Sequence, residues 1–151
     1  MSETRCGFVA IAGRPNVGKS TLVNQLVGAK VAITSSRPQT TRRAIRGVIT
    51  EGDTQIVLVD LPGVQRPRDV LTKRMQKRVE REIADNDSAL LILNAKEGIG
   101  SGDRFTADLI AARKVPTTVV VNKIDLTGKA KTLPQLAAAA TLIDESGLPP
   151  E

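Results

Sequence analysis

The sequence contains no histidine, tryptophan or tyrosine, and it contains a single cysteine, Cys6. Without histidine there is no imidazole to act as a general base or a metal ligand, and there are no tryptophan or tyrosine rings on which bases could stack. One cysteine cannot form an internal disulfide, and neither a signal peptide nor a membrane-spanning run is evident. We therefore expect a cytoplasmic protein without an integral membrane segment, whose chemistry comes from lysine, serine, threonine, asparagine, backbone groups and Mg²⁺.

Length and charge narrow the class of protein. The 151 residues have a mass of 16.1 kDa, which fits one domain spanning residues 1–151 with a hydrophobic core. Lysine and arginine number 22 against 16 aspartate and glutamate, so the net charge is +6 and the pI is about 9.9. This balance favours a polyanionic partner such as RNA, although a nucleotide pocket also needs positive charge.

Residues 13–20 read GRPNVGKS, which matches the phosphate-binding pattern GxxxxGK[ST]. Its two glycines let the backbone curl so that successive N–H groups face one anion. Lys19 adds a charge for the β- and γ-phosphates, and Ser20 offers a hydroxyl to Mg²⁺. An apolar run precedes the loop and helical spacing follows it, so a helix N-terminus adds to the anion site. The residues expected to bind phosphates are Gly13, Arg14, Pro15, Asn16, Val17, Gly18, Lys19, Ser20 and Thr21.

Two further motifs follow predicted strands. Residues 60–63 read DLPG, in which Asp60 can hold Mg²⁺ and the Gly63 N–H can contact the γ-phosphate. Residues 122–125 read NKID, in which Asp125 can accept hydrogen bonds from the N1–H and exocyclic amine of guanine. Adenine presents the wrong pattern, and losing two charge-assisted bonds would cost at least about a hundredfold in affinity. The base-reading residues are therefore predicted to be Asn122, Lys123 and Asp125.

The polar segment between the first helix and the second strand contains adjacent threonines in the sequence QTTR. A threonine hydroxyl there could join Mg²⁺ only when a γ-phosphate is present, which would make the segment a nucleotide-dependent switch. Thr41 is the first candidate ligand and Thr40 the second, because spacing alone cannot separate neighbours. A solvated loop without such a role is the alternative.

Short apolar runs alternate with helical stretches along the chain, which predicts an α/β fold with a doubly wound, mostly parallel sheet and helices on both faces. Strands are expected at 7–12, 44–50, 55–60, 88–95 and 117–121, with a hairpin turn at 51–54. Helices are expected at 20–27, 70–84, 103–114 and 129–147, the last beginning near Thr132. Buried structural roles are expected for Ile11, Leu22, Leu26, Val57, Leu91, Leu93, Val119 and Val121.

The segments GRPNVGKST, PQTTR, DLPGV and NKID together resemble the Era-type GTPases, Ras-like bacterial proteins with a P-loop G domain. The resemblance covers nearly the whole chain. It implies binding of GTP or GDP with Mg²⁺, hydrolysis of GTP, and a switch function in assembly of the small (30S) ribosomal subunit. For the full-length family it also implies 16S rRNA binding through a C-terminal KH domain, and peripheral membrane association is a further expectation.

The resemblance also suggests how hydrolysis would proceed. Ras-like enzymes place a water-orienting glutamine after the DxxG glycine, but this chain has Val64 there, so we expect slow hydrolysis. Asn16 matches a residue that holds a potassium ion in related GTPases; a loop-stabilising hydrogen bond is the alternative role. The residues expected to act in hydrolysis are Lys19, Asn16, Gly63 and Thr41, and those expected to hold Mg²⁺ are Ser20, Thr41 and Asp60.

The family pattern continues with a further strand, a Ser-Ala loop that contacts the guanine O6, and a final helix. This chain stops at Glu151, so we expect a fragment that lacks this strand and helix as well as the KH domain, with one sheet edge exposed. Two alternatives to a GTPase stay open. The chain could bind guanine nucleotides with negligible hydrolysis, because Val64 replaces glutamine, or it could be a P-loop ATPase, which Asp125 disfavours.

Overall fold

A computed structural model describes residues 3–34 and 43–150 of the chain. Within these ranges strands and helices alternate except at the consecutive strands β2 and β3, and a short 3₁₀ helix (η1) follows the last strand. The elements are β1 (Arg5–Ala12), α1 (Lys19–Val27), β2 (Ile45–Glu51), β3 (Thr54–Asp60), α2 (Val70–Ala84), β4 (Ser88–Asn94), α3 (Ser101–Ala111), β5 (Thr117–Asn122), η1 (Ile124–Leu126) and α4 (Lys129–Ser146).

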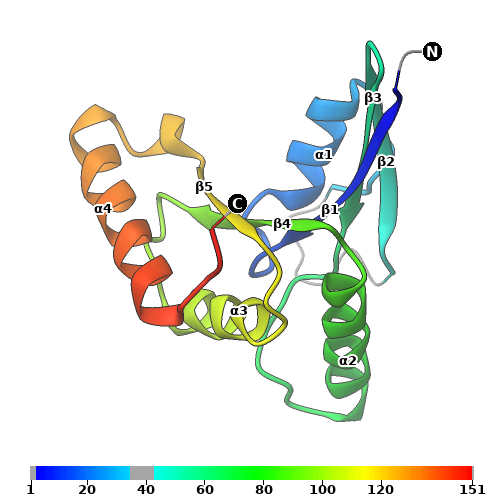
Figure 1. Cartoon of the computed structure of the whole chain (residues 1–151). Helices are drawn as coiled ribbons and strands as arrows, with labels where there is room; N and C mark the ends of the chain where they lie inside the picture. Colours follow the sequence, from blue (N-terminus) through cyan, green and yellow to red (C-terminus); the bar gives the residue numbers. More distant parts are fainter. Residues whose placement is uncertain (1–2, 35–42, 151) are drawn as a thin grey trace.

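The strands form one sheet in the order β2-β3-β1-β4-β5. Strands β3, β1, β4 and β5 run parallel, whereas β2 pairs antiparallel with β3. Glu51 pairs with Thr54 across the predicted hairpin, and Gly52 between them adopts φ 60°, which a glycine tolerates without strain. The predicted doubly wound α/β fold, with a mostly parallel sheet, is confirmed (Figure 1).

Helices cover both faces of the sheet because alternate strand residues point to opposite sides. On one face Val23 of α1 packs with Ile11 and Ile92. Gly47 of β2 leaves room for this helix, since a Cβ atom there would lie 2.6 Å from Cγ2 of Val27. Helices α2, α3 and α4 contribute to the core on the other face, and Figure 1 shows α1 on the opposite side of the sheet from α2 and α3.

The predicted helix boundaries differ from the observed ones in α3 and α4. Helix α3 begins at Ser101 rather than residue 103, because the Asp103 carboxylate accepts a hydrogen bond from the N–H of Gly100 and so caps an earlier start. It ends at Ala111, before Lys114, which has a positive φ of 55°. Helix α4 begins at Lys129, three residues before Thr132, with Pro134 inside it.

One prediction of a buried side chain was wrong. Leu26 of α1 is 46% exposed, whereas Val23 of the same helix is 0% exposed. Helical spacing identified the apolar residues of α1, but its nine residues turn only one side toward the sheet. Leu26 lies outside that side.

Candidate functional site

The GRPNVGKS segment forms the connection between β1 and α1, at the carboxyl end of a central strand where ligands bind in open α/β sheets. Three of its residues have positive φ angles: 155° at Gly13, 64° at Asn16 and 103° at Gly18. A Cβ atom at Gly13 would lie 2.7 Å from the Ile92 carbonyl oxygen, and one at Gly18 would lie 2.4 Å from Nδ2 of Asn122. The loop therefore requires both glycines for its conformation and for the close approach of its neighbours.

Lys19, the first residue of α1, extends back into the loop. Its Nζ donates to the carbonyl oxygens of Gly13 at 3.1 Å and Arg14 at 2.7 Å, and the residue is 7% exposed. Burial lowers the pKa of Lys19 from 10.5 to about 8, while the nearby Asp60 carboxylate opposes this shift. Taken alone, the shift makes the folded chain gain stability as pH rises from about 8 to 10.5, since the unfolded lysine keeps its proton there. A bound phosphate would instead stabilise the charged ammonium.

Ser20 and Asp60 supply the oxygen atoms expected of a magnesium site. The Ser20 hydroxyl donates to Oδ2 of Asp60 at 2.6 Å, and Asp60 is 0% exposed. No group of three or more His, Cys, Asp or Glu side chains suited to a metal occurs in residues 3–34 and 43–150. Mg²⁺ at a nucleotide site needs only one or two carboxylates, because substrate phosphates and water complete its shell. The hydroxyl and carboxylate oxygens of this pair fit that ion.

The DLPGV segment packs directly against the phosphate loop. The Val64 N–H donates to the Gly13 carbonyl oxygen at 2.9 Å, and a Cβ atom on Gly63 would lie 2.8 Å from Cα of Pro15. The Val64 side chain is 3% exposed and belongs to the hydrophobic core, so it offers no polar group to a water molecule. Gln65 lines a pocket with Gln76 and other residues of α2.

The NKID segment reaches the same loop from β5. Nδ2 of Asn122 donates to the Val17 carbonyl oxygen at 2.9 Å, and Nζ of Lys123 donates to the Asn16 carbonyl oxygen at 2.6 Å. Asp125 lies in η1 and is exposed. The predicted phosphate loop and the predicted base-reading motif are therefore parts of one continuous site, a relationship that the linear sequence does not show.

The sequence predictions missed two polar residues that support this region. Asn24 of α1 accepts from the N–H groups of Val31 and Ala32 through Oδ1 and donates to the Ala32 carbonyl through Nδ2. Asp103 binds the Arg14 side chain and is buried. An acidic residue in the first turn is a helix-start signal, but the contact of Asp103 with Arg14 spans 89 residues and has no local signature.

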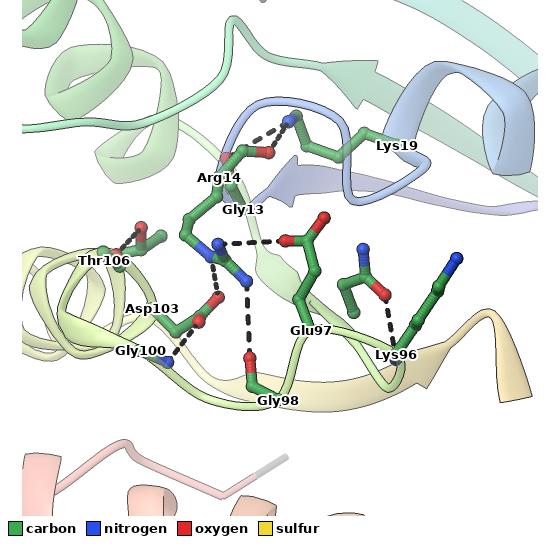
Figure 2. A network of polar contacts seen from close by, with 11 residues as sticks. Gly13, Arg14, Lys19, Lys96, Glu97, Gly98, Gly100, Asp103 and Thr106 are labelled. Atoms are coloured by element: carbon green, nitrogen blue, oxygen red, sulfur yellow. Dashed lines mark hydrogen bonds and ion pairs between the residues drawn. The ribbon is translucent and has the colours of Figure 1, made fainter. Parts of the chain in front are cut away.

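Of the remaining predicted site residues, two are described by the structure and two are not. Thr21 is exposed on the first turn of α1, and Arg14 directs its side chain toward the start of α3 (Figure 2). Thr40 and Thr41, the two candidates for a switch ligand, lie outside the described residues. Their predicted role stays a prediction.

Comparison with protein families matches residues 8–123 to a family described as 50S ribosome-binding GTPase. The chain belongs to this family. The match includes the phosphate loop, the DLPGV segment and the first two residues of NKID. The sequence-based resemblance to Era-type GTPases is confirmed by the relatives described next.

The GTPase Era of Mycobacterium avium (strain 104) is 50% identical over 148 residues, covering 97% of this chain and 50% of that protein. The GTPase Era of Mycobacterium tuberculosis (strain H37Rv) is 49% identical over 146 residues, covering 95% and 49%. This chain thus spans about half the length of the curated relatives it matches.

Solved structures of Era also match this chain. A crystal structure of Era in complex with MgGDPNP and nucleotides 1506–1542 of 16S ribosomal RNA matches with a TM-score of 0.86 and 38% identity, covering 92% of this chain and 48% of that one. A single-residue variant of Aquifex aeolicus Era bound to GDP·AlF4⁻ matches with a TM-score of 0.84 and 35% identity, covering 93% of this chain and 48% of that one.

Proposed function

We propose that residues 1–151 form a guanine-nucleotide-binding domain that binds GTP and GDP with Mg²⁺ and hydrolyses GTP slowly. The observation that carries this proposal is the pair of hydrogen bonds from Asn122 and Lys123 to the phosphate loop. These bonds bring a motif suited to guanine beside a loop suited to phosphates, so one nucleotide can engage both. Ser20 and Asp60 would hold Mg²⁺, which would neutralise phosphate charge when bound.

Slow hydrolysis follows from the environment of Val64. Its buried side chain cannot orient an attacking water. The next residue is a glutamine, Gln65, but it lines a pocket beside α2. A guanine-binding module with negligible hydrolysis is the second candidate, and the burial of Val64 is the observation that favours it. An ATPase is disfavoured by Asp125, whose carboxylate can accept from guanine but has no matching donor pair on adenine.

We propose that the nucleotide state regulates contact with 16S ribosomal RNA during assembly of the small ribosomal subunit in the cytoplasm. The similar Era structure that contains 16S rRNA supports this partner. The outer side of α2 supports it too, because its exposed basic residues form a surface with positive charge. These residues are Lys73, Arg74, Lys77, Arg78 and Arg81.

The acidic residues of α2 do not neutralise that surface. Glu80 pairs with Arg113 of α3 at 2.6 Å, and Glu82 pairs with Arg46 of β2 at 3.4 Å. Each carboxylate thus compensates a charge from a neighbouring element instead of one on α2. The basic side of α2 keeps its charge for an anionic partner.

Fluorescent-GDP binding to this chain, competed by GDP and by ADP, tests the nucleotide proposal. Displacement by GDP alone, and loss of binding in Asp125→Asn, would support it, because the asparagine amide replaces one acceptor with a donor. Asp108→Asn makes the same chemical change at an exposed site on α3 and should bind normally. Equal displacement by ADP would overturn the guanine assignment. Single-turnover hydrolysis of GTP then separates the slow enzyme from the binding module.

RNA binding is tested with a fragment matching nucleotides 1506–1542 of 16S rRNA. The double variant Arg74→Glu, Lys77→Glu should weaken binding and reduce its salt dependence, since phosphate contacts release counterions. Lys129→Glu, Lys131→Glu makes the same charge change on exposed residues of α4 and serves as the control. Equal losses in both variants would point to net charge rather than to α2.

A further inference from the structure

A buried carboxylate outside all the predicted motifs contacts the phosphate loop. Asp103 of α3 is 0% exposed, and its Oδ1 accepts a hydrogen bond from Nε of Arg14 at 2.8 Å. Its Oδ2 accepts from the N–H of Gly100, the residue at the N-cap position of α3, also at 2.8 Å. One side chain therefore joins the phosphate loop to the first turn of α3 (Figure 2).

The rest of the Arg14 guanidinium group binds the connection between β4 and α3. Nη1 lies 3.2 Å from Oε2 of Glu97, and Nη2 donates to the Gly98 carbonyl oxygen at 3.4 Å. At the other end of the residue, the Arg14 carbonyl oxygen accepts from Nζ of Lys19 at 2.7 Å. Arg14 is thus held through its side chain by one loop while its main chain contacts the lysine expected to bind phosphate.

Gly102 makes this arrangement sterically possible. A Cβ atom on Gly102 would lie 2.6 Å from Cδ and 3.1 Å from Cγ of Arg14. Those distances are shorter than van der Waals contact, so an alanine here would force the arginine stem to move. Because the guanidinium is held at several points, such a movement would strain or break its contacts with Asp103 and Glu97.

The burial of each carboxylate determines how strongly it holds the Arg14 guanidinium group. The Asp103 side chain is fully buried, whereas the Glu97 side chain is 52% exposed. Charge-assisted hydrogen bonds shielded from water are strong, whereas an exposed ion pair contributes little. Asp103 is therefore the main anchor of Arg14.

We propose that Asp103 is a positioning residue for the nucleotide: through Arg14 it holds the Gly13–Arg14 segment of the phosphate loop in place and so slows nucleotide release. This inference rests on the proposed binding of guanine nucleotides. It assigns to the start of α3, which contains no nucleotide-binding motif, control over how long a nucleotide stays bound.

The decisive variant is Gly102→Ala, because it displaces the Arg14 stem and leaves Asp103 in place. Alanine favours a helix more than glycine does, so the substitution itself should not weaken α3. Any loss of thermal stability in the nucleotide-free chain should therefore not exceed the contribution of the displaced contact. We expect fluorescent GDP to dissociate about tenfold faster. Substitutions at residues that couple two sites change binding by about this factor. The dissociation rate is measured by stopped flow after mixing with excess unlabelled GDP.

Gly100→Ala is the matched control. A Cβ atom at Gly100 would meet only Oδ2 of Asp103 at 3.9 Å, an ordinary contact, and its φ of −117° suits alanine. Dissociation from this variant should match that from the unmodified chain. Asp103→Asn, which keeps the shape of the side chain but removes its charge, should behave as Gly102→Ala does. Glu97→Gln should have little effect because Glu97 is half exposed.

These measurements distinguish failure of the proposed guanine-nucleotide binding from failure of the positioning role of Asp103. If the unmodified chain fails to bind fluorescent GDP, or releases it equally to GDP and ADP, the proposed guanine-binding function fails and this inference fails with it. If the unmodified chain binds specifically, but Gly102→Ala and Asp103→Asn release GDP at the rate of the Gly100→Ala and Glu97→Gln controls, only the positioning role is overturned. Slower release from Asp103→Asn would also overturn it, since that result would mean the freed Arg14 binds phosphate.

Discussion

Asn122 donates a hydrogen bond from Nδ2 to the carbonyl oxygen of Val17, joining residues 105 positions apart at a distance of 2.9 Å. Asn122 ends β5 and Val17 lies in the phosphate loop, so the bond connects the base-reading segment to the phosphate-binding segment. Lys123 makes a parallel contact with Asn16. An asparagine and a lysine that the sequence suggests as base-reading residues thus also support the loop on which the phosphates would rest.

Asn122→Ala should weaken both the fold and nucleotide binding. The buried Val17 would lose the donor to its carbonyl oxygen, which should lower the free energy of unfolding by about 1 kcal/mol. GDP affinity should fall by about tenfold because the two segments lose their connection. Urea denaturation and fluorescent-GDP titration measure the two quantities. Gln25→Ala removes an exposed amide from α1 and should change neither, whereas an unaltered affinity in Asn122→Ala would refute the supporting role.

Gly63→Ala should disturb the phosphate loop at Pro15. The added Cβ atom would lie 2.8 Å from Cα and N of Pro15, which are backbone atoms that cannot move without shifting the loop. Overpacking of this kind should lower the free energy of unfolding by about 1–3 kcal/mol and weaken GDP binding. Gly7→Ala is the control, because its nearest atom would be Oδ2 of Asp87 at 3.8 Å. Equal stability of the two variants, measured by urea denaturation, would contradict the expected clash.

The N-terminus of α2 provides a test of pH dependence. Oδ1 of Asp69 accepts from the Thr72 N–H at 2.8 Å, and this bond lowers the pKa of Asp69 below 3.8. The folded carboxylate therefore binds a proton less readily than the unfolded one, so its stabilising effect is present at neutral pH and is lost as the pH falls through the folded pKa.

Asp69→Ala should consequently lower the melting temperature by about 2–4 °C at pH 7, with the difference narrowing below pH 3.8. Thermal melts between pH 3 and pH 7 measure this change. Asp69→Asn keeps a capping oxygen without a titrating carboxylate, so its melting temperature should lie close to that of the unmodified chain at pH 7. A difference between Asp69→Ala and the unmodified chain that stays constant down to pH 3 would show that Asp69 acts without its charge.

Potassium dependence tests the predicted role of Asn16. This residue is exposed in the phosphate loop and has a φ of 64°. A potassium ion held there would place positive charge beside the phosphates as charge develops, so replacing sodium with potassium should accelerate single-turnover GTP hydrolysis by at least about tenfold. Asn16→Ala should lose this acceleration while still binding GDP. Equal rates in sodium and potassium would leave only the loop-stabilising role.

Local signals were sufficient to predict most of the fold. Alternation of apolar runs with helical spacing predicted each strand and α-helix of the described chain, and the boundaries of α2 agree with residues 70–84. The errors in α3 occurred where a local side-chain cap or a special backbone angle decides a boundary. Asp103 capped an earlier start of α3, and Lys114 adopted the positive φ that follows its end.

The burial of individual apolar residues was harder to predict. Leu26 and Val23 have similar hydrophobicity and lie on the same short helix, yet only Val23 is buried. The side of α1 that carries Val23 and Val27 lies against Gly47 of β2, where a Cβ atom would be 2.6 Å from Cγ2 of Val27 and 3.3 Å from Cγ1 of Val23. A sequence pattern cannot specify such packing between segments distant along the chain.

Local patterns in the sequence were enough to propose a nucleotide site: the loop glycines, Lys19, the Ser20 and Asp60 oxygens and the NKID segment stand at the short, fixed spacings that binding of phosphate, magnesium and guanine requires. How these groups support one another becomes visible in the folded chain alone. The bonds from Asn122 to Val17 and from Arg14 to Asp103 join residues 105 and 89 positions apart. Such contacts depend on where parallel strands end within one sheet, and no local pattern of residues records that position.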